Sequence, residues 1–128
     1  MKRFLLIDDD DIICMVHSVI IKSVFPDADI EVLRSSREAQ VYLTKLYREN
    51  EPPPNFIFLD ISMPEMSGFE FLDKLNPMQL NYLAQAKIYI LSSTIDQRDM
   101  DMIERYDIIQ GFIGKPLSVE YLLQNCKN

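Results

Sequence analysis

Short apolar runs alternate along the chain with longer stretches in which apolar residues recur at helical spacing. The runs cover residues 4–7, 30–33, 56–59, 88–91 and 111–114. Near-continuous apolar character over so few residues is typical of strands that are buried on both faces of a parallel sheet. The stretches with the i, i+3, i+4 spacing of an amphipathic helix cover residues 12–24, 39–47, 69–75, 96–106 and 117–126. The pattern therefore predicts five strands, each followed by a helix.

Two features refine the predicted fold. The run at 56–59 is apolar throughout, so we expect it at the centre of the sheet. Pro77 breaks or restarts the helix that begins near residue 69, and residues 78–86 are expected to extend it. Strands that alternate with helices form a parallel sheet covered on both faces. The predicted fold class is α/β: a five-stranded parallel sheet with one covering helix per unit, doubly wound as in flavodoxin-like (βα)5 proteins.

Composition excludes some classes of function. A chain of 128 residues, 48% of them hydrophobic, fits a single domain over residues 1–128 with no output domain. The net charge of −7 disfavours nucleic acid and anionic membranes as partners, since both reward positive charge. Cys14 and Cys126 lie far apart and there is one histidine, so a zinc site is not expected. Free thiols, with no signal peptide and no membrane-spanning stretch, agree with a cytoplasmic protein.

Charged side chains follow three of the predicted strands. Asp8 and Asp9 come directly after the first strand, Asp60 after the third and Lys115 after the fifth. The carboxyl ends of parallel strands meet at one edge of a sheet, so we expect these groups to lie together. Crowded carboxylates favour a hard divalent cation, and a lysine beside them favours an anionic second ligand. The sequence therefore predicts a site for Mg²⁺ and a phosphoryl group.

Each of these signals has a simpler explanation when it stands alone. The acids at 8–11 could form a turn and a helix cap. Ser92 and Ser93 could do the same after the fourth strand. Lys115 and Pro116 could form a turn with a cis peptide bond. The joint occurrence of these groups at four strand ends is what favours a functional site.

The same motifs match a known family. The segments IDDDD, FIFLDISMPEMSGFEFL, IYILSST and GFIGKPLS closely resemble the receiver domain of two-component response regulators, of the stand-alone, chemotaxis-regulator type. The likeness covers essentially the whole chain. It implies that Asp60 accepts a phosphoryl group and that Mg²⁺, or Mn²⁺, is bound. The implied metal ligands are Asp8, Asp9, Asp60 and the backbone carbonyl of Ser62.

The resemblance also implies roles for the remaining groups of the site. Lys115 would pair with the phosphoryl group, Ser92 would bond it through its hydroxyl, and Phe112 would be the switch aromatic that turns inward. The added charge would shift a conformational equilibrium and repack the surface of the fourth helix, the fifth strand and the last helix. Such a domain catalyses its own aspartyl phosphorylation and dephosphorylation, and is not a conventional enzyme.

The implied partners are a histidine kinase or histidine phosphotransfer domain, and an unknown downstream protein. The donor is expected to dock at the start of the first helix, which carries Ile12, Ile13 and Val16. The downstream protein is expected on the fourth helix, the fifth strand and the last helix, although ordinary packing explains each residue there equally well. The candidate contact residues are Tyr106, Phe112, Leu117 and Tyr121.

Three features depart from the usual pattern of the family. Phe112 stands where tyrosine is commoner, which removes a hydroxyl but leaves the ring free to rotate. Ser62 and Thr94 flank the path of a water that would attack the acyl phosphate, and neither is an acid or amide suited to orienting it. Asp8 and Asp60 are also farther apart in the sequence than is usual in the family, and the proline-rich loop at 50–55 accommodates the additional residues.

Two other functions are compatible with parts of the sequence. A haloacid dehalogenase-like phosphatase would use Asp8 as the nucleophile and Asp10 as the acid, with Ser92 and Lys115 as later motif residues. That family resembles a longer chain, and the assignment leaves Asp60 without a role. A receiver-shaped interaction module that no longer needs phosphate would bind its partner even after Asp60→Asn. Every expected site residue is present, so the sequence gives that module no positive support.

Overall fold

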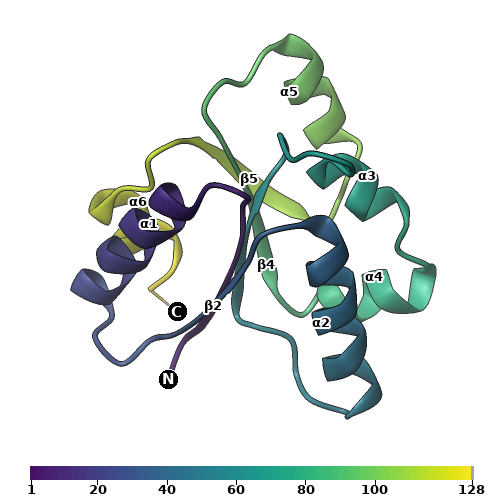
Figure 1. Cartoon of the computed structure of the whole chain (residues 1–128), viewed down its shortest axis with the longest axis horizontal. Helices are drawn as coiled ribbons and strands as arrows, with labels where there is room; N and C mark the ends of the chain where they lie inside the picture. The colour runs from purple at the N-terminus through teal and green to yellow at the C-terminus, as the bar shows by residue number, and fades with distance from the viewer. Residues whose placement is uncertain (128) are drawn as a thin grey trace.

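A computed structural model describes residues 1–127 and contains a central sheet flanked by helices (Figure 1). The described strands are β1 (Arg3–Ile7), β2 (Asp29–Leu33), β3 (Phe56–Asp60), β4 (Lys87–Ser92) and β5 (Ile109–Gly114). The described helices are α1 (Asp11–Val24), α2 (Ser36–Arg48), α3 (Gly68–Asp73), α4 (Pro77–Leu83), α5 (Gln97–Glu104) and α6 (Val119–Asn125). Within these residues the sheet is 5-stranded and parallel, in the order β2-β1-β3-β4-β5. The predicted doubly wound α/β fold, with β3 at its centre, is confirmed.

The side chains of β1 show how the strands contribute to two hydrophobic layers. Leu5 and Ile7 pack on the face covered by α2, α3, α4 and α5, and Phe4 and Leu6 pack on the face covered by α1 and α6 (Figure 1). None of the four is more than 2% exposed. The alternation follows from the two-residue period of a strand. Burial on both faces explains why the predicted strands are apolar almost throughout.

The predicted break at Pro77 between β3 and β4 is confirmed, and the residues after it form a separate helix that ends at Leu83. The chain forms α3 and α4 there, because Pro77 occupies the first turn of α4 and cannot donate the backbone N–H that a continuous helix needs. Asn76 and Gln79 cap the start of α4 through reciprocal hydrogen bonds. This unit therefore has two covering helices, which corrects the prediction of one helix per strand.

Other elements occur as predicted but with shifted ends. α5 is shorter than the predicted helix over 96–106, because Asp96 caps its start. α6 begins later than expected because Ser118 caps it. β5 begins at Ile109 and so includes residues before the predicted 111–114. In the described part of the chain, no helix is both long and apolar enough to cross a bilayer.

Candidate functional site

The site forms where β1 and β3 end side by side. Asp8 directly follows β1, and Asp60 is the last residue of β3, which pairs with β1. With Asp9 they form a group of carboxylates in which one oxygen from each residue lies within 4.8 Å of the others. Asp8 and Asp60 are only 4% and 3% exposed, whereas Asp9 is exposed. The structure thus brings together the acids that the sequence placed at one sheet edge.

Lys115 places a buried ammonium group between the two buried acids. Its Nζ lies 2.7 Å from Oδ2 of Asp8 and 3.5 Å from Oδ2 of Asp60. Lys115 directly follows β5, and its backbone N–H donates to the Ser92 carbonyl of β4 at 2.9 Å. That bond fixes the start of the loop from which the lysine reaches across the strand ends.

Burial and crowding change the acid–base behaviour of these groups. The pKa of Asp60 rises from 3.8 to about 6, chiefly because burial removes the carboxylate from water, with repulsion from Asp8 as a further cause. The Ser62 N–H and the Lys115 ammonium oppose this rise. Burial by itself would lower the pKa of Lys115, but its contacts with Asp8 and Asp60 raise that pKa overall. The cluster therefore holds more negative charge than the lysine neutralises.

The donor set fits a hard divalent cation. Oδ1 of Asp8 accepts the Asp10 N–H. The buried Oδ2 of Asp8 accepts no hydrogen bond of normal geometry, although the Lys115 ammonium lies 2.7 Å away. Among the described residues the ammonium is thus the one partner of this oxygen, and a single ammonium does not offset the repulsion among the crowded carboxylates of Asp8, Asp9 and Asp60. Carboxylate oxygens are the ligands that Mg²⁺ and Mn²⁺ prefer, so the residues present suit such a cation.

The loop after β3 turns back over the site. The Ser62 N–H donates to Oδ1 of Asp60 at 3.1 Å, which holds the backbone of Ser62 beside that carboxylate. Ser36 supports the loop from α2, because its buried hydroxyl donates to the Met66 carbonyl at 3.0 Å. At Gly68 a Cβ would lie 2.7 Å from the Asp60 carbonyl oxygen. The sequence carries no signal for this close approach.

The Ser92 hydroxyl is turned toward its own loop. Ser92 is buried at the end of β4, and its Oγ donates to the Thr94 carbonyl at 2.8 Å. The hydroxyl must therefore rotate before it can bond a group on Asp60. Phe112 lies opposite Ile90 in the register of β4 and β5 and is 40% exposed. A switch role for Ser92 or Phe112 stays a prediction.

The candidate docking residues near α5 and α6 differ in exposure. Leu117 is 1% exposed and packs in the layer beneath α1 and α6, so its expected place in a docking surface is wrong. Burial of the leucine side chain in the core stabilises the fold relative to leaving that side chain in water. Tyr106 stacks on Phe69, and Tyr121 packs edge-on against Tyr89. Both of these tyrosines are partly buried and keep some accessible surface.

α1 presents an exposed apolar surface close to the acids. Ile12 and Val16 are 69% and 37% exposed, while Ile13 is partly buried. Met15 and Val19 of the same helix are 62% and 65% exposed. Ile12, Met15, Val16 and Val19 follow the i, i+3, i+4, i+7 spacing of one helix face, and we call them the α1 stripe. That spacing was visible in the sequence, but it did not show which face of the helix is buried.

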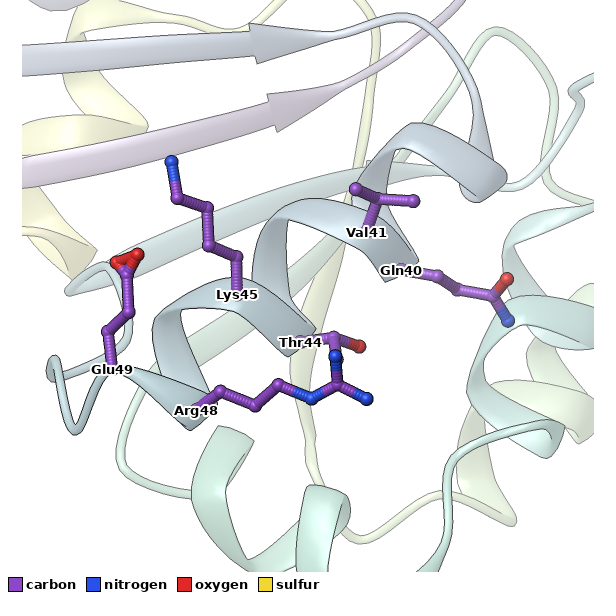
Figure 2. A pocket seen from close by; sticks show the side chains of 6 residues that line it. All are labelled: Gln40, Val41, Thr44, Lys45, Arg48 and Glu49. Atoms are coloured by element: carbon purple, nitrogen blue, oxygen red, sulfur yellow. The ribbon is translucent and has the colours of Figure 1, made fainter.

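Figure 2 shows a shallow depression along α2. It is lined by Gln40, Val41, Thr44, Lys45, Arg48 and Glu49. These side chains come from one helix or its end, and the acids and the lysine of the site are not among them. The depression therefore adds no chemistry to the site.

Comparison with known proteins identifies a family. The response regulator receiver domain family matches residues 4–127. Chemotaxis protein CheY of Listeria monocytogenes is 30% identical over 124 residues, which cover 97% of this chain and 94% of that protein. Stress response regulator protein 1 of Meyerozyma guilliermondii is 28% identical over 120 residues, which cover 93% of this chain. The chain spans 51% of the length of that second relative.

Structural comparison gives the same result. A two component response regulator from Cytophaga hutchinsonii superimposes with a TM-score of 0.83 and 30% identity, covering 97% of this chain and 92% of that one. The phosphatase alternative is not favoured, because Asp10, its expected acid, instead caps α1 by accepting the N–H groups of Ile12 and Ile13. The family match extends over residues 4–127, and the family's motifs meet at one sheet edge. The chain therefore belongs to the response regulator receiver domain family, whose members act in phosphorelay signalling.

Proposed function

We propose that Asp60 accepts a phosphoryl group from a histidine-bearing donor and that its phosphorylation switches a docking surface. The observation that carries the proposal is the position of the Lys115 ammonium, 2.7 Å from Asp8 and 3.5 Å from Asp60. A cation held among acids at this distance can stabilise an anionic group that arrives on Asp60. Membership of the family supports the class of reaction, transfer of a phosphoryl group from a phosphohistidine to an aspartate.

The Asp60 carboxylate would attack phosphorus in line with the leaving nitrogen of the donor. An O–P bond forms as the P–N bond breaks, and the electron pair of the broken bond stays on the donor imidazole, which takes up a proton. The Lys115 ammonium would stabilise the charge on the equatorial phosphoryl oxygens. With a pKa of about 6, Asp60 is ionised at neutral pH, as a nucleophilic carboxylate must be.

We propose that Asp8, Asp9, Asp60 and the carbonyl of Ser62 hold Mg²⁺, with Mn²⁺ as an alternative. When bound, the cation supplies positive charge that offsets the repulsion among carboxylates and phosphoryl oxygens. Asp8 accepts the Asp10 N–H and Asp60 accepts the Ser62 N–H, so both carboxylates are held in place from their own backbone. The exposed Asp9 would complete the set from the solvent side.

Phosphorylation would change the hydrogen bonding of Ser92. Its hydroxyl would leave the Thr94 carbonyl, 2.8 Å away, and donate to a phosphoryl oxygen on Asp60. The ring of Phe112, 40% exposed on β5, would then turn inward and repack the surface of α5, β5 and α6. A downstream protein would bind this surface more tightly after phosphorylation. Because Phe112 lacks a hydroxyl, packing alone would transmit the change.

We propose that the donor contacts the α1 stripe. The stripe begins at Ile12, directly after the acids, and Ile12, Met15 and Val19 are each more than 60% exposed. A helix laid along it would bring a phosphohistidine to the same edge of the sheet as Asp60. Met15→Glu should therefore slow transfer from a phosphorylated histidine phosphotransfer domain and leave phosphorylation by acetyl phosphate unchanged. Equal rates for wild type and variant with the protein donor would contradict the assignment.

Phosphorylation by acetyl phosphate tests the chemistry directly. In the presence of Mg²⁺ the intact mass should increase by one phosphoryl group, and neither Asp60→Asn nor a magnesium-free sample should show the adduct. Ser93→Ala, at an exposed position beside Ser92, is the matched control and should be phosphorylated like wild type. Steady release of phosphate that depends on Asp8 and not on Asp60 would contradict the proposal. A protein that takes no phosphoryl group and does not bind beryllofluoride would support the phosphate-independent interaction module.

A further inference from the structure

His17 joins α1 to the loop that carries Lys115. The side chain is 1% exposed, and its Nε2 accepts the Leu117 N–H at 3.1 Å. The two residues lie 100 positions apart in the sequence. A ring that accepts at Nε2 must be neutral, with its proton on Nδ1. Burial lowers the pKa of His17, so the fold keeps the imidazole in this accepting form.

Two backbone anchors flank the lysine. The Lys115 N–H donates to the Ser92 carbonyl of β4 at 2.9 Å. Pro116 has no N–H to donate, so the next backbone donor is that of Leu117, which His17 accepts. The segment from Lys115 to Leu117 is therefore tied to β4 at one end and to α1 at the other. His17 supplies the second of these ties.

The same face of α1 also touches the end of β1. Cys14, one turn before His17, is buried, and its Sγ lies 3.5 Å from the Asp8 carbonyl oxygen as a weak donor. α1 thus contacts the strand end that carries Asp8 and the loop that carries Lys115. The 2.7 Å distance between Lys115 Nζ and Asp8 Oδ2 depends on how these two segments are placed. A loosened tie at His17 would let the lysine loop move relative to the acids.

We propose that His17 is a positioning residue that holds the Leu117 N–H and thereby sets the Lys115 ammonium at the distance from Asp60 that phosphoryl transfer needs. The inference rests on the proposed function of Asp60, and it assigns His17 no contact with the phosphoryl group. The Leu117 side chain anchors the same loop by packing, since it is 1% exposed. The experiment must therefore separate the hydrogen bond from the packing.

Three variants make this separation. His17→Gln keeps an acceptor oxygen at a similar reach, and His17→Leu keeps the bulk but cannot accept a hydrogen bond. Ile21→Val removes bulk from the same buried face of α1 but removes no hydrogen bond to the lysine loop, and it is the matched control. With saturating acetyl phosphate and excess Mg²⁺, the phosphorylation rate of His17→Leu should fall on the order of 10-fold, because small displacements of a catalytic group have effects of that size. His17→Gln should stay within about 3-fold of wild type, and Ile21→Val should match it.

The affinity for Mg²⁺ shows whether the effect is local. None of the proposed ligands lies in the lysine loop, and the Lys115 ammonium contacts two of them, Asp8 and Asp60. A displaced ammonium leaves more negative charge for the cation, so a thermal-shift titration should give His17→Leu an affinity for Mg²⁺ at least as high as that of wild type. A loss of affinity that parallels the loss of rate would mean that the whole site has loosened, and would overturn the inference. An unchanged rate in His17→Leu, or no recovery in His17→Gln, would overturn it as well.

Amide hydrogen exchange distinguishes failure of this inference from failure of the proposed function. If wild type accepts no phosphoryl group, the proposed function fails, and exchange alone decides whether His17 holds the loop. The Leu117 amide should exchange on the order of 10-fold faster in His17→Leu and at nearly the wild-type rate in His17→Gln. Unchanged exchange in His17→Leu would overturn the inference even when Asp60 is phosphorylated.

Discussion

Replacing Asp60 with asparagine is expected to stabilise the metal-free protein. Asp60 is 3% exposed and lies in a cluster with two other carboxylates. Burial, with repulsion from Asp8, raises its pKa from 3.8 to about 6, so the ionised form is less favourable in the folded protein than in the unfolded chain. Asparagine has almost the same shape, carries no charge and can still accept the Ser62 N–H.

The size of the effect follows from the pKa. One pKa unit corresponds to about 1.4 kcal/mol, so a pKa of about 6 in place of 3.8 means that ionised Asp60 lowers the free energy of unfolding by about 3 kcal/mol at neutral pH. That figure already includes the attraction of Lys115. Burying the asparagine amide has its own cost, so we expect a net gain of about 1 to 3 kcal/mol. The melting temperature should then rise by about 4 °C for each kcal/mol.

The pH dependence of the free energy of unfolding tests the direction of this effect a second time. The folded pKa lies above the unfolded one, so the folded state binds more protons between the two values. The destabilisation by ionised Asp60 is therefore fully present above about pH 6 and disappears as the pH falls through 3.8. The advantage of Asp60→Asn should be largest at neutral pH and vanish in acid.

Urea unfolding of wild type and Asp60→Asn in a chelating buffer, from pH 4 to pH 8, measures this directly. Asp9→Asn is the matched control and should give a smaller gain, because Asp9 is exposed. Excess Mg²⁺ should reduce the advantage of Asp60→Asn, since a bound cation offsets the same repulsion. A variant that is less stable than wild type at neutral pH, or a difference that does not change with pH, would refute the reasoning.

Three further changes have defined outcomes. Gly68→Ala should lower the free energy of unfolding by about 2 kcal/mol, because the new Cβ would lie 2.7 Å from a backbone oxygen. Gly114→Ala is its control and should lower that free energy far less, because a Cβ there meets nothing within 4 Å. Urea unfolding of both variants measures the difference. Burial lowers the pKa of His17, so stability should fall as the pH drops below about 6.5, and thermal melts of His17→Gln should show a flatter pH profile. Lys115→Met should lower the free energy of unfolding of the metal-free protein by about 3 kcal/mol in urea, because it leaves the buried Asp8 and Asp60 without the lysine ammonium. This loss should be smaller in the double variant that also carries Asp60→Asn.

The strands and the meeting of the acids were predictable because both depend on local signals. Burial on both faces made each strand a short apolar run, and the two-residue period placed Leu5 and Phe4 in different layers. The acids followed the strands directly, so parallel pairing alone brought Asp8 and Asp60 together. The roles of the site residues and the extent of the domain stay predictions.

Features that depend on distant packing were not predictable. From the sequence, Leu117 could equally have faced solvent or the core. Its side chain is buried because α6 packs against α1. The bond between His17 and the Leu117 N–H joins segments with no common pattern. The close approach of Gly68 to the Asp60 carbonyl likewise depends on how the loop after β3 folds back. Pro77 marked a break, but its neighbour Asn76 was needed to start a second helix.

Chemical trapping of the phosphorylated residue tests the central claim most directly. An acyl phosphate on aspartate is reduced by borohydride to homoserine, and peptide mass spectrometry then locates the altered position. After treatment with acetyl phosphate and Mg²⁺, we predict homoserine at position 60, in the peptide that contains the end of β3. Homoserine at position 8, or no reduced residue in a protein that gains the mass of a phosphoryl group, would contradict it.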